Sequence, residues 1–162
     1  MLRYICENFN VKNAIIILPD AGGTKCATAI TDCLDLNFTL IYKECQKLNE
    51  VSRMVLISDV QGKVAIIVDD IIDTYGTLVK AADTLIANGA ESVVAIVTHG
   101  ILSGKAIEAI NGSKLRKLVV TNTVPHEEKK RHCPKLETID ISPTVSTGRD
   151  PILIWWLMNH LL

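Results

Sequence analysis

The sequence predicts an α/β fold in which a mainly parallel sheet is flanked by helices. Short runs of aliphatic and β-branched residues recur along the chain. Several are continuously apolar, as strands buried on both faces are. Segments with helical character alternate with them, which is the order that a parallel sheet requires. We expect strands at 14–18, 38–42, 53–58, 64–68, 92–97, 117–120 and 136–141, and helices at 23–35, 76–88 and 103–111.

The composition is that of a globular protein with one main core. The chain has 162 residues, of which 48% are hydrophobic and 22% are charged. The formal net charge of −1 argues against a broad electrostatic grip on nucleic acid or on an anionic membrane surface. The strongly charged run at 127–132 mixes both signs and is typical of a solvated loop or a helix start.

The cysteines and the ends of the chain favour a cytoplasmic protein. The sequence has an odd number of cysteines, without a CxxC pair, which predicts free thiols in a reducing compartment. They are Cys6, Cys26, Cys33, Cys45 and Cys133. The first residues do not resemble a secretory leader. The apolar stretch "ILIWWLMNHLL" near the C-terminus is shorter than the roughly 20 residues that span a bilayer.

The segment "VAIIVDDIIDTYGTL" (64–78) is the most informative in the chain. Its apolar start predicts a buried strand, so we expect Asp69 and Asp70 at the strand's carboxyl end, where open α/β sheets bind ligands. The turn after them falls where the next helix begins, and its backbone amides would form an anion site. The acids could accept hydrogen bonds from vicinal sugar hydroxyls. The expected phosphate-binding residues are Asp73, Thr74, Tyr75, Gly76 and Thr77.

A simpler interpretation of this segment is a helix start whose acids favour the positive end of the helix dipole. It accounts for one aspartate near the turn, but poorly for two at the end of a strand.

Two further junctions have unusual chemistry. In "LPDAGGTK" (18–25), Gly22 and Gly23 would let backbone amides face a ligand, and Lys25 adds positive charge; an ordinary tight turn is the alternative. In "YKECQKLNEVSRM" (42–54), a long polar connection joins two strands, and such connections are often functional. Lys43 considered alone would be a solvated surface lysine.

These motifs together resemble one enzyme family. Two acids followed by a Thr-x-Gly-Thr turn resemble the ribose-phosphate motif of type I phosphoribosyltransferases, which implies their fold. The form "DDIIDTYGT" is more similar to ribose-phosphate pyrophosphokinases, also called PRPP synthetases. "THGILSGKAIEAI" (98–110), "VVTNTVPH" (119–126) and "CPKLETIDIS" (133–142) resemble that family in order and spacing.

The resemblance implies roles for the two upstream loops. The Pro-Asp-x-Gly-Gly loop of the family holds the pyrophosphate side of the site, and its aspartate, here Asp20, serves Mg²⁺. The matching loop consists of Asp20, Ala21, Gly22, Gly23 and Lys25. Lys43 matches the cation of the family's flexible catalytic loop. Cys26 and Cys45 depart from the family, which usually has arginine at both positions.

The resemblance also implies the domain limits and the reaction. Residues 1–142 are similar to the C-terminal domain of a PRPP synthetase, and 143–162 form a divergent tail. The implied reaction transfers diphosphate from Mg-ATP to ribose 5-phosphate, giving PRPP and AMP, in a homo-oligomer or together with PRPP synthetase subunits. Two alternatives stay open: a non-catalytic PRPP synthetase-associated subunit, which Cys26 and Cys45 favour, and a type I phosphoribosyltransferase that consumes PRPP.

Overall fold

The computed structural model describes residues 2–19, 24–34, 36–44 and 53–147. The strands are β1 Ala14–Leu18, β2 Asn37–Glu44, β3 Arg53–Leu56, β4 Val64–Ile72, β5 Ser92–Gly100, β6 Lys117–Thr121 and β7 Leu136–Ile139. The helices are α1 Leu2–Asn8, α2 Thr24–Leu34, α3 Gly76–Ala87, α4 Ala106–Gly112, α5 Glu127–His132 and α6 Ser142–Thr147, with a 3-10 turn η1 at Val11–Asn13. Every expected strand and helix is present, with ends shifted by a few residues.

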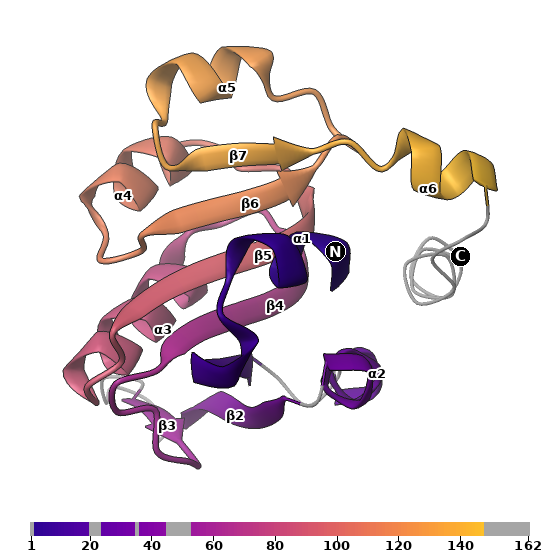
Figure 1. The fold of residues 1–162 in the computed structure, drawn as a ribbon. Coiled ribbons are helices and arrows are strands. Elements are labelled where there is room, and N and C mark those ends of the chain that lie inside the picture. The colour runs from indigo at the N-terminus through magenta and orange to yellow at the C-terminus, as the bar shows by residue number, and fades with distance from the viewer. Residues whose placement is uncertain (1, 20–23, 35, 45–52, 148–162) are drawn as a thin grey trace.

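The strands form one seven-stranded sheet in the order β3-β2-β1-β4-β5-β6-β7 (Figure 1). β3 pairs antiparallel with β2, and the other neighbours pair in parallel. The prediction of a mainly parallel sheet flanked by helices is therefore confirmed. In this order the long central strands β4 and β5 lie side by side, and the helix that connects them, α3, packs against the sheet.

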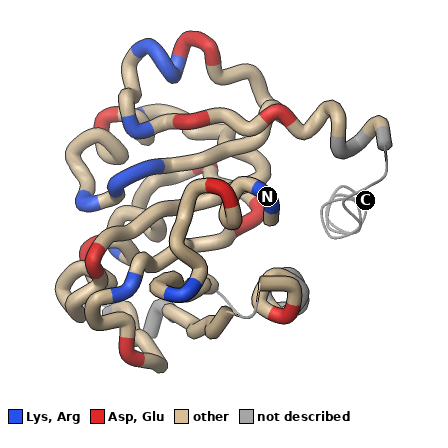
Figure 2. Tube along the Cα trace, in the orientation of Figure 1, with Lys and Arg blue, Asp and Glu red and all other residues tan. Residues whose placement is uncertain are grey.

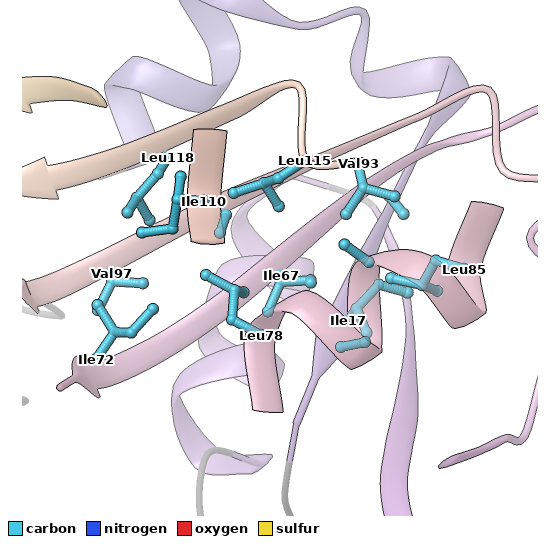
Figure 3. Close-up of a cluster of buried hydrophobic side chains, with 14 of the residues drawn as sticks. Ile17, Ile67, Ile72, Leu78, Leu85, Val93, Val97, Ile110, Leu115 and Leu118 are labelled. Atoms are coloured by element: carbon cyan, nitrogen blue, oxygen red, sulfur yellow. The ribbon is translucent and has the colours of Figure 1, made fainter. Parts of the chain in front are cut away.

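Helices cover both faces of the sheet, and each face has its own core. α3 and α4 contribute Leu78, Leu85 and Ile110 to the cluster drawn in Figure 3, against strand residues such as Ile67. α1 and α2 cover the opposite face with Ile5 and Ile30. Because the central strands are buried from both sides, all residues of β1 are buried, which explains its continuously apolar sequence.

The strand expected at 64–68 is longer than predicted. β4 continues through Asp69 and Asp70 to Ile72, because the nine-residue strand β5 runs beside it and keeps its backbone paired. The register joins Asp69 to Val97 and Ile72 to Gly100. The expected strand end at residue 68 is therefore four residues too early, and the two aspartates lie at the carboxyl end of β4 as expected, but within the strand.

The helix ends follow their local signals. α3 stops where the sequence predicted, with Asn88 as its C-cap and Gly89 at φ +86. The run at 127–132 is a helix, α5, whose acidic residues precede its basic ones, as the helix dipole favours (Figure 2).

At the carboxyl end of α4, Lys135 Nζ donates to the carbonyl oxygens of Ser113 at 2.7 Å and Ile110 at 3.2 Å.

The described cysteines Cys6, Cys33 and Cys133 are free thiols. Within the described part of the chain, none of the helices has the length and apolarity that crossing a membrane requires.

Candidate functional site

A pocket of about 480 Å³ lies at the carboxyl end of β4, beside the start of α3. That volume is within the usual range for small-ligand sites. Its floor is apolar and comes from the sheet and from α3. Its polar lining consists of the side chains that the sequence singled out, Asp69, Asp70, Asp73, Thr74 and Thr77. The structure therefore brings these five predicted residues together around one space, whereas the predicted residues Tyr75 and Gly76 are not among those that line it.

The two strand aspartates each accept one hydrogen bond from the backbone. The N–H of Asp70 donates to Asp69 Oδ1 at 2.9 Å, and the N–H of Ile71 donates to Asp70 Oδ1 at 2.8 Å. These bonds occur where β1 has already ended at Leu18. β1 no longer pairs with β4 at this level, whereas β5 does, and the two carboxylates hold backbone amides in the last residues of β4. A carboxylate has about four acceptor positions, so it can accept a backbone bond and further hydrogen bonds at the same time.

The turn after β4 presents backbone amides at the start of α3. Residues 73–75 bend the chain, and α3 begins at Gly76. Tyr75 is the N-cap residue, and its side chain makes no capping hydrogen bond. The first N–H groups of a helix have no partner within the helix, so they are available to an anion at this position.

Gly76, the first residue of α3, has open space beside its Cα atom. A Cβ atom built at this glycine meets no heavy atom within 4 Å. The first turn of α3 contains no acidic residue, and Asp69 and Asp70 lie within β4. The simpler interpretation, acids placed at the positive end of the helix dipole, therefore does not describe these two residues.

His99 lies on β5 beside the last residues of β4, and sequence reasoning gave it no catalytic role. Its Nδ1 lies 2.9 Å from Thr123 Oγ1, and it pairs in register with Ile71, the residue after Asp70. Burial lowers the pKa of His99, and the charge of Asp70 partly opposes that shift. The interaction with Asp70 depends on strand register, so the sequence carried no signal for it.

The two upstream loops are only partly within the described residues. Asp20, Ala21, Gly22 and Gly23 lie outside them, as do the side chains of Lys25 and Lys43. The backbone of Lys25 belongs to α2. The backbone of Lys43 belongs to β2, where it pairs with Met54 of β3. The predicted functional connection 42–54 therefore joins the two strands of an antiparallel hairpin.

The donors that line the pocket suit a hard cation. Mg²⁺ prefers carboxylate oxygens and is commonly held by one or two of them together with substrate phosphates and water. Asp69, Asp70 and Asp73 offer such oxygens. Within the described ranges there is no group of three or more His, Cys, Asp or Glu side chains that could hold a metal by themselves. The residues thus fit a cation that is shared with a bound phosphate.

Comparison with known proteins assigns the family. A family model described as the phosphoribosyl synthetase-associated domain matches residues 46–149. The chain belongs to this family. Among its relatives, ribose-phosphate pyrophosphokinase 3 of Saccharomyces cerevisiae is 61% identical over 146 residues. Ribose-phosphate pyrophosphokinase 2 of Schizosaccharomyces pombe is 62% identical over 144 residues.

The chain spans less than half the length of these relatives. The matches cover 90% and 88% of this chain, but only 46% and 45% of the two relatives. The predicted resemblance to ribose-phosphate pyrophosphokinases is confirmed. The assignment to the C-terminal part of such an enzyme stays a prediction.

Solved structures agree with this family. The phosphoribosylpyrophosphate synthetase from Mycobacterium smegmatis superposes with a TM-score of 0.79 at 32% identity, over 91% of this chain and 47% of that one. A hypoxanthine phosphoribosyltransferase from Staphylococcus aureus superposes with a TM-score of 0.52 at 16% identity, over 61% of this chain and 58% of that one, which shows the fold alone. The predicted type I phosphoribosyltransferase-like fold is confirmed.

Proposed function

We propose that the chain supplies the ribose-phosphate half of a ribose-phosphate diphosphokinase. In the complete enzyme, the anomeric hydroxyl of ribose 5-phosphate attacks the β-phosphorus of ATP, so that diphosphate moves to the sugar and AMP leaves. The observation that carries this proposal is the pocket at the start of α3, where carboxylates and helix amides line one space. Relatives named ribose-phosphate pyrophosphokinase, at 61% and 62% identity, support the choice of reaction.

The proposal divides ribose 5-phosphate between two parts of the pocket. Its 5-phosphate occupies the amides and hydroxyls of Asp73, Thr74, Tyr75, Gly76 and Thr77, where the positive end of α3 favours a dianion. Its vicinal hydroxyls donate to the carboxylates of Asp69 and Asp70. Both carboxylates line the pocket beside the turn, and a carboxylate can accept several hydrogen bonds at once, which supports their role as acceptors for the sugar.

The proposal assigns the diphosphate side to the upstream loops. Backbone amides of the loop 20–23, with Lys25, hold the diphosphate, and Asp20 serves Mg²⁺. When bound, the cation neutralises charge on the phosphoryl oxygens. Lys43 supplies a positive charge to the same oxygens. Lys43→Ala is then expected to lower turnover far more than ribose 5-phosphate affinity in a complete enzyme, as measured by AMP release and calorimetry. Unchanged turnover would remove Lys43 from the mechanism.

A regulatory subunit is the second candidate. Cys26 and Cys45 stand where the family usually has arginine, which favours a chain that binds catalytic subunits without making product. A phosphoribosyltransferase that consumes PRPP is less well supported, because the structures of that class match at identities that speak for the fold alone.

The same proposed function implies the domain limits, the cellular location and the assembly of the chain. Residues 1–142 form the phosphoribosyltransferase-like domain and 143–162 a divergent tail. The chain acts in the cytoplasm, where thiols such as the exposed Cys6 and Cys33 stay reduced. It assembles with copies of itself or with PRPP synthetase subunits.

One experiment separates these functions. The purified chain is incubated with Mg-ATP and ribose 5-phosphate, alone and with a catalytic PRPP synthetase subunit, and AMP and PRPP are measured beside calorimetric binding of ribose 5-phosphate. Product from the chain, alone or assembled above the subunit's own rate, supports the diphosphokinase. Sugar-phosphate binding without added product supports the regulatory subunit. A folded chain that does not bind ribose 5-phosphate contradicts both.

A further inference from the structure

The loop that follows β5 holds the two carbonyl groups with which the phosphate-binding turn begins. The N–H groups of Ile101 and Leu102 donate to the carbonyl oxygen of Ile72 at 2.8 and 3.2 Å. The N–H of Ser103 donates to the carbonyl oxygen of Asp73 at 3.1 Å. Three consecutive N–H groups of the loop after β5 therefore hold two consecutive carbonyl groups at the end of β4.

Those bonds also decide where the first amides of the turn point. A trans peptide is planar, with its C=O and N–H on opposite sides. When the carbonyls of Ile72 and Asp73 face the 101–103 loop, the N–H groups of the same two peptides, those of Asp73 and Thr74, face away from it. Asp73 and Thr74 both line the pocket. The 101–103 loop thus orients the amides at the entrance of the anion site.

The 101–103 loop has a conformation that needs support. Leu102 has φ +53, and among the described residues it is the one non-glycine with a positive φ. The left-handed region is unfavourable for a residue with a branched side chain. Such strain persists where the surroundings over-determine the backbone, and it gathers at functional sites. The Leu102 side chain is buried, which supplies part of that support.

The rest of the support comes from two side chains at the start of α5. His126 is 2% exposed, and its Nε2 lies 2.7 Å from the carbonyl oxygen of Gly100. Because a carbonyl only accepts, Nε2 carries the hydrogen. Lys129 Nζ donates to the carbonyl oxygen of Ile101. A Cβ atom at Gly100 would lie 3.0 Å from His126 Nε2 and 2.7 Å from Val120 Cγ1, so the ring and the loop are in close contact.

We propose that His126, assisted by Lys129, is a positioning residue for the ribose-phosphate site. It touches no ligand. It holds the carbonyl of Gly100, so that the 101–103 loop keeps its strained form and aims the amides of Asp73 and Thr74 into the pocket. This inference rests on the proposed binding of ribose 5-phosphate. It adds to the determinants of that site a residue that caps α5 and is far along the chain from the motif.

The test compares three variants of the full chain. His126→Ala removes the donor, His126→Gln replaces it with a side-chain amide N–H, and Lys135→Met is the matched control. Lys135 also donates to backbone carbonyls, at the end of α4, but has no bond to the 101–103 loop. Each variant is measured by thermal unfolding, by calorimetry with ribose 5-phosphate, and by hydrogen exchange of the amides of 101–103. Lys129→Met is used in the same way if His126→Ala does not fold.

We expect His126→Ala to weaken ribose 5-phosphate binding by about five- to tenfold, the effect of losing one buried orienting hydrogen bond. The 101–103 amides should exchange faster, and His126→Gln should restore both values. Lys135→Met should lower the unfolding temperature without changing either. The inference is overturned if His126→Ala, or Lys129→Met in its place, leaves affinity and exchange unchanged, or if Lys135→Met changes them equally. If the wild-type chain does not bind ribose 5-phosphate, the proposed function fails, and the exchange comparison still decides whether His126 holds the loop.

Discussion

Replacing Gly76 by alanine should separate the stability of the fold from ligand binding. Gly76 is the first residue of α3, its φ lies outside the left-handed region, and a Cβ atom there meets no heavy atom within 4 Å. The folded chain can therefore accept alanine without strain. The methyl group would, however, stand in the open space before the helix amides, where we place the 5-phosphate. The substitution should leave the fold intact and obstruct the ligand.

The substitution should raise the stability of the fold and lower the affinity for ribose 5-phosphate. Glycine within a helix is less stable than alanine by about 0.5–1 kcal/mol, so Gly76→Ala should raise the free energy of unfolding by up to that amount. A hydrogen bond to a charged group contributes about 1.5–3 kcal/mol. Displacing the phosphate enough to lose one such bond should weaken ribose 5-phosphate binding by about tenfold or more.

The assay is urea unfolding together with calorimetric titration by ribose 5-phosphate. Gly112→Ala is the matched control, because Gly112 ends α4, its Cβ position is equally open, and it belongs to a different helix from the proposed phosphate site. Wild-type affinity in Gly112→Ala and reduced affinity in Gly76→Ala are expected. Equal affinities in both variants would refute the placement of the phosphate before α3. A lower free energy of unfolding in Gly76→Ala would contradict the open space at the Cβ position of Gly76.

Three further predictions use the same protein. Asp70→Asn keeps an acceptor for the N–H of Ile71 but loses the negative charge. The free energy of unfolding should therefore change by less than about 0.5 kcal/mol, while ribose 5-phosphate binding weakens about tenfold. Unchanged affinity in calorimetry would exclude the sugar contact. Burial lowers the pKa of His99, so the unfolded chain binds more protons than the folded chain does. The contribution of neutral His99 to stability is therefore complete above the ordinary pKa of 6.5 and is lost as the pH falls through the pKa of the folded chain. Because the charge of Asp70 raises this pKa, NMR titration of Asp70→Asn should show a still lower pKa for His99. Leu85→Ala removes a fully buried side chain from α3 and should cost about 2–5 kcal/mol in urea unfolding, whereas a cost below about 1 kcal/mol would contradict the packing in Figure 3.

The part of the site that could be predicted from the sequence is the part that is contiguous in it. The turn 73–77 and the acids before it lie within nine residues, so local strand and helix signals were enough to place them together. The expected end of β4 is too early, because a charged residue such as Asp69 is a local signal for the end of a buried strand. The length of that strand is set by β5 beside it, and pairing between strands outweighs the preference of a single residue.

The supports behind the site could not be predicted in this way. The bonds from the 101–103 loop to Ile72 and Asp73, and from His126 to Gly100, join segments that are 26 or more residues apart. They depend on the register of β4, β5 and β6 and on where α5 begins. A histidine before a charged run has no local signal for such a contact. The same holds for the influence of Asp70 on the pKa of His99.

The central claim is that the amides at the start of α3 bind the phosphate of ribose 5-phosphate. The most direct measurement is an amide NMR titration of the full chain with ribose 5-phosphate, with ribose as the control without phosphate. We predict saturable shifts that are largest at Asp73, Thr74, Gly76 and Thr77, and no such shifts with ribose. A folded chain whose amides at 73–77 stay unchanged while ribose 5-phosphate is added, or that responds equally to ribose, would contradict the account.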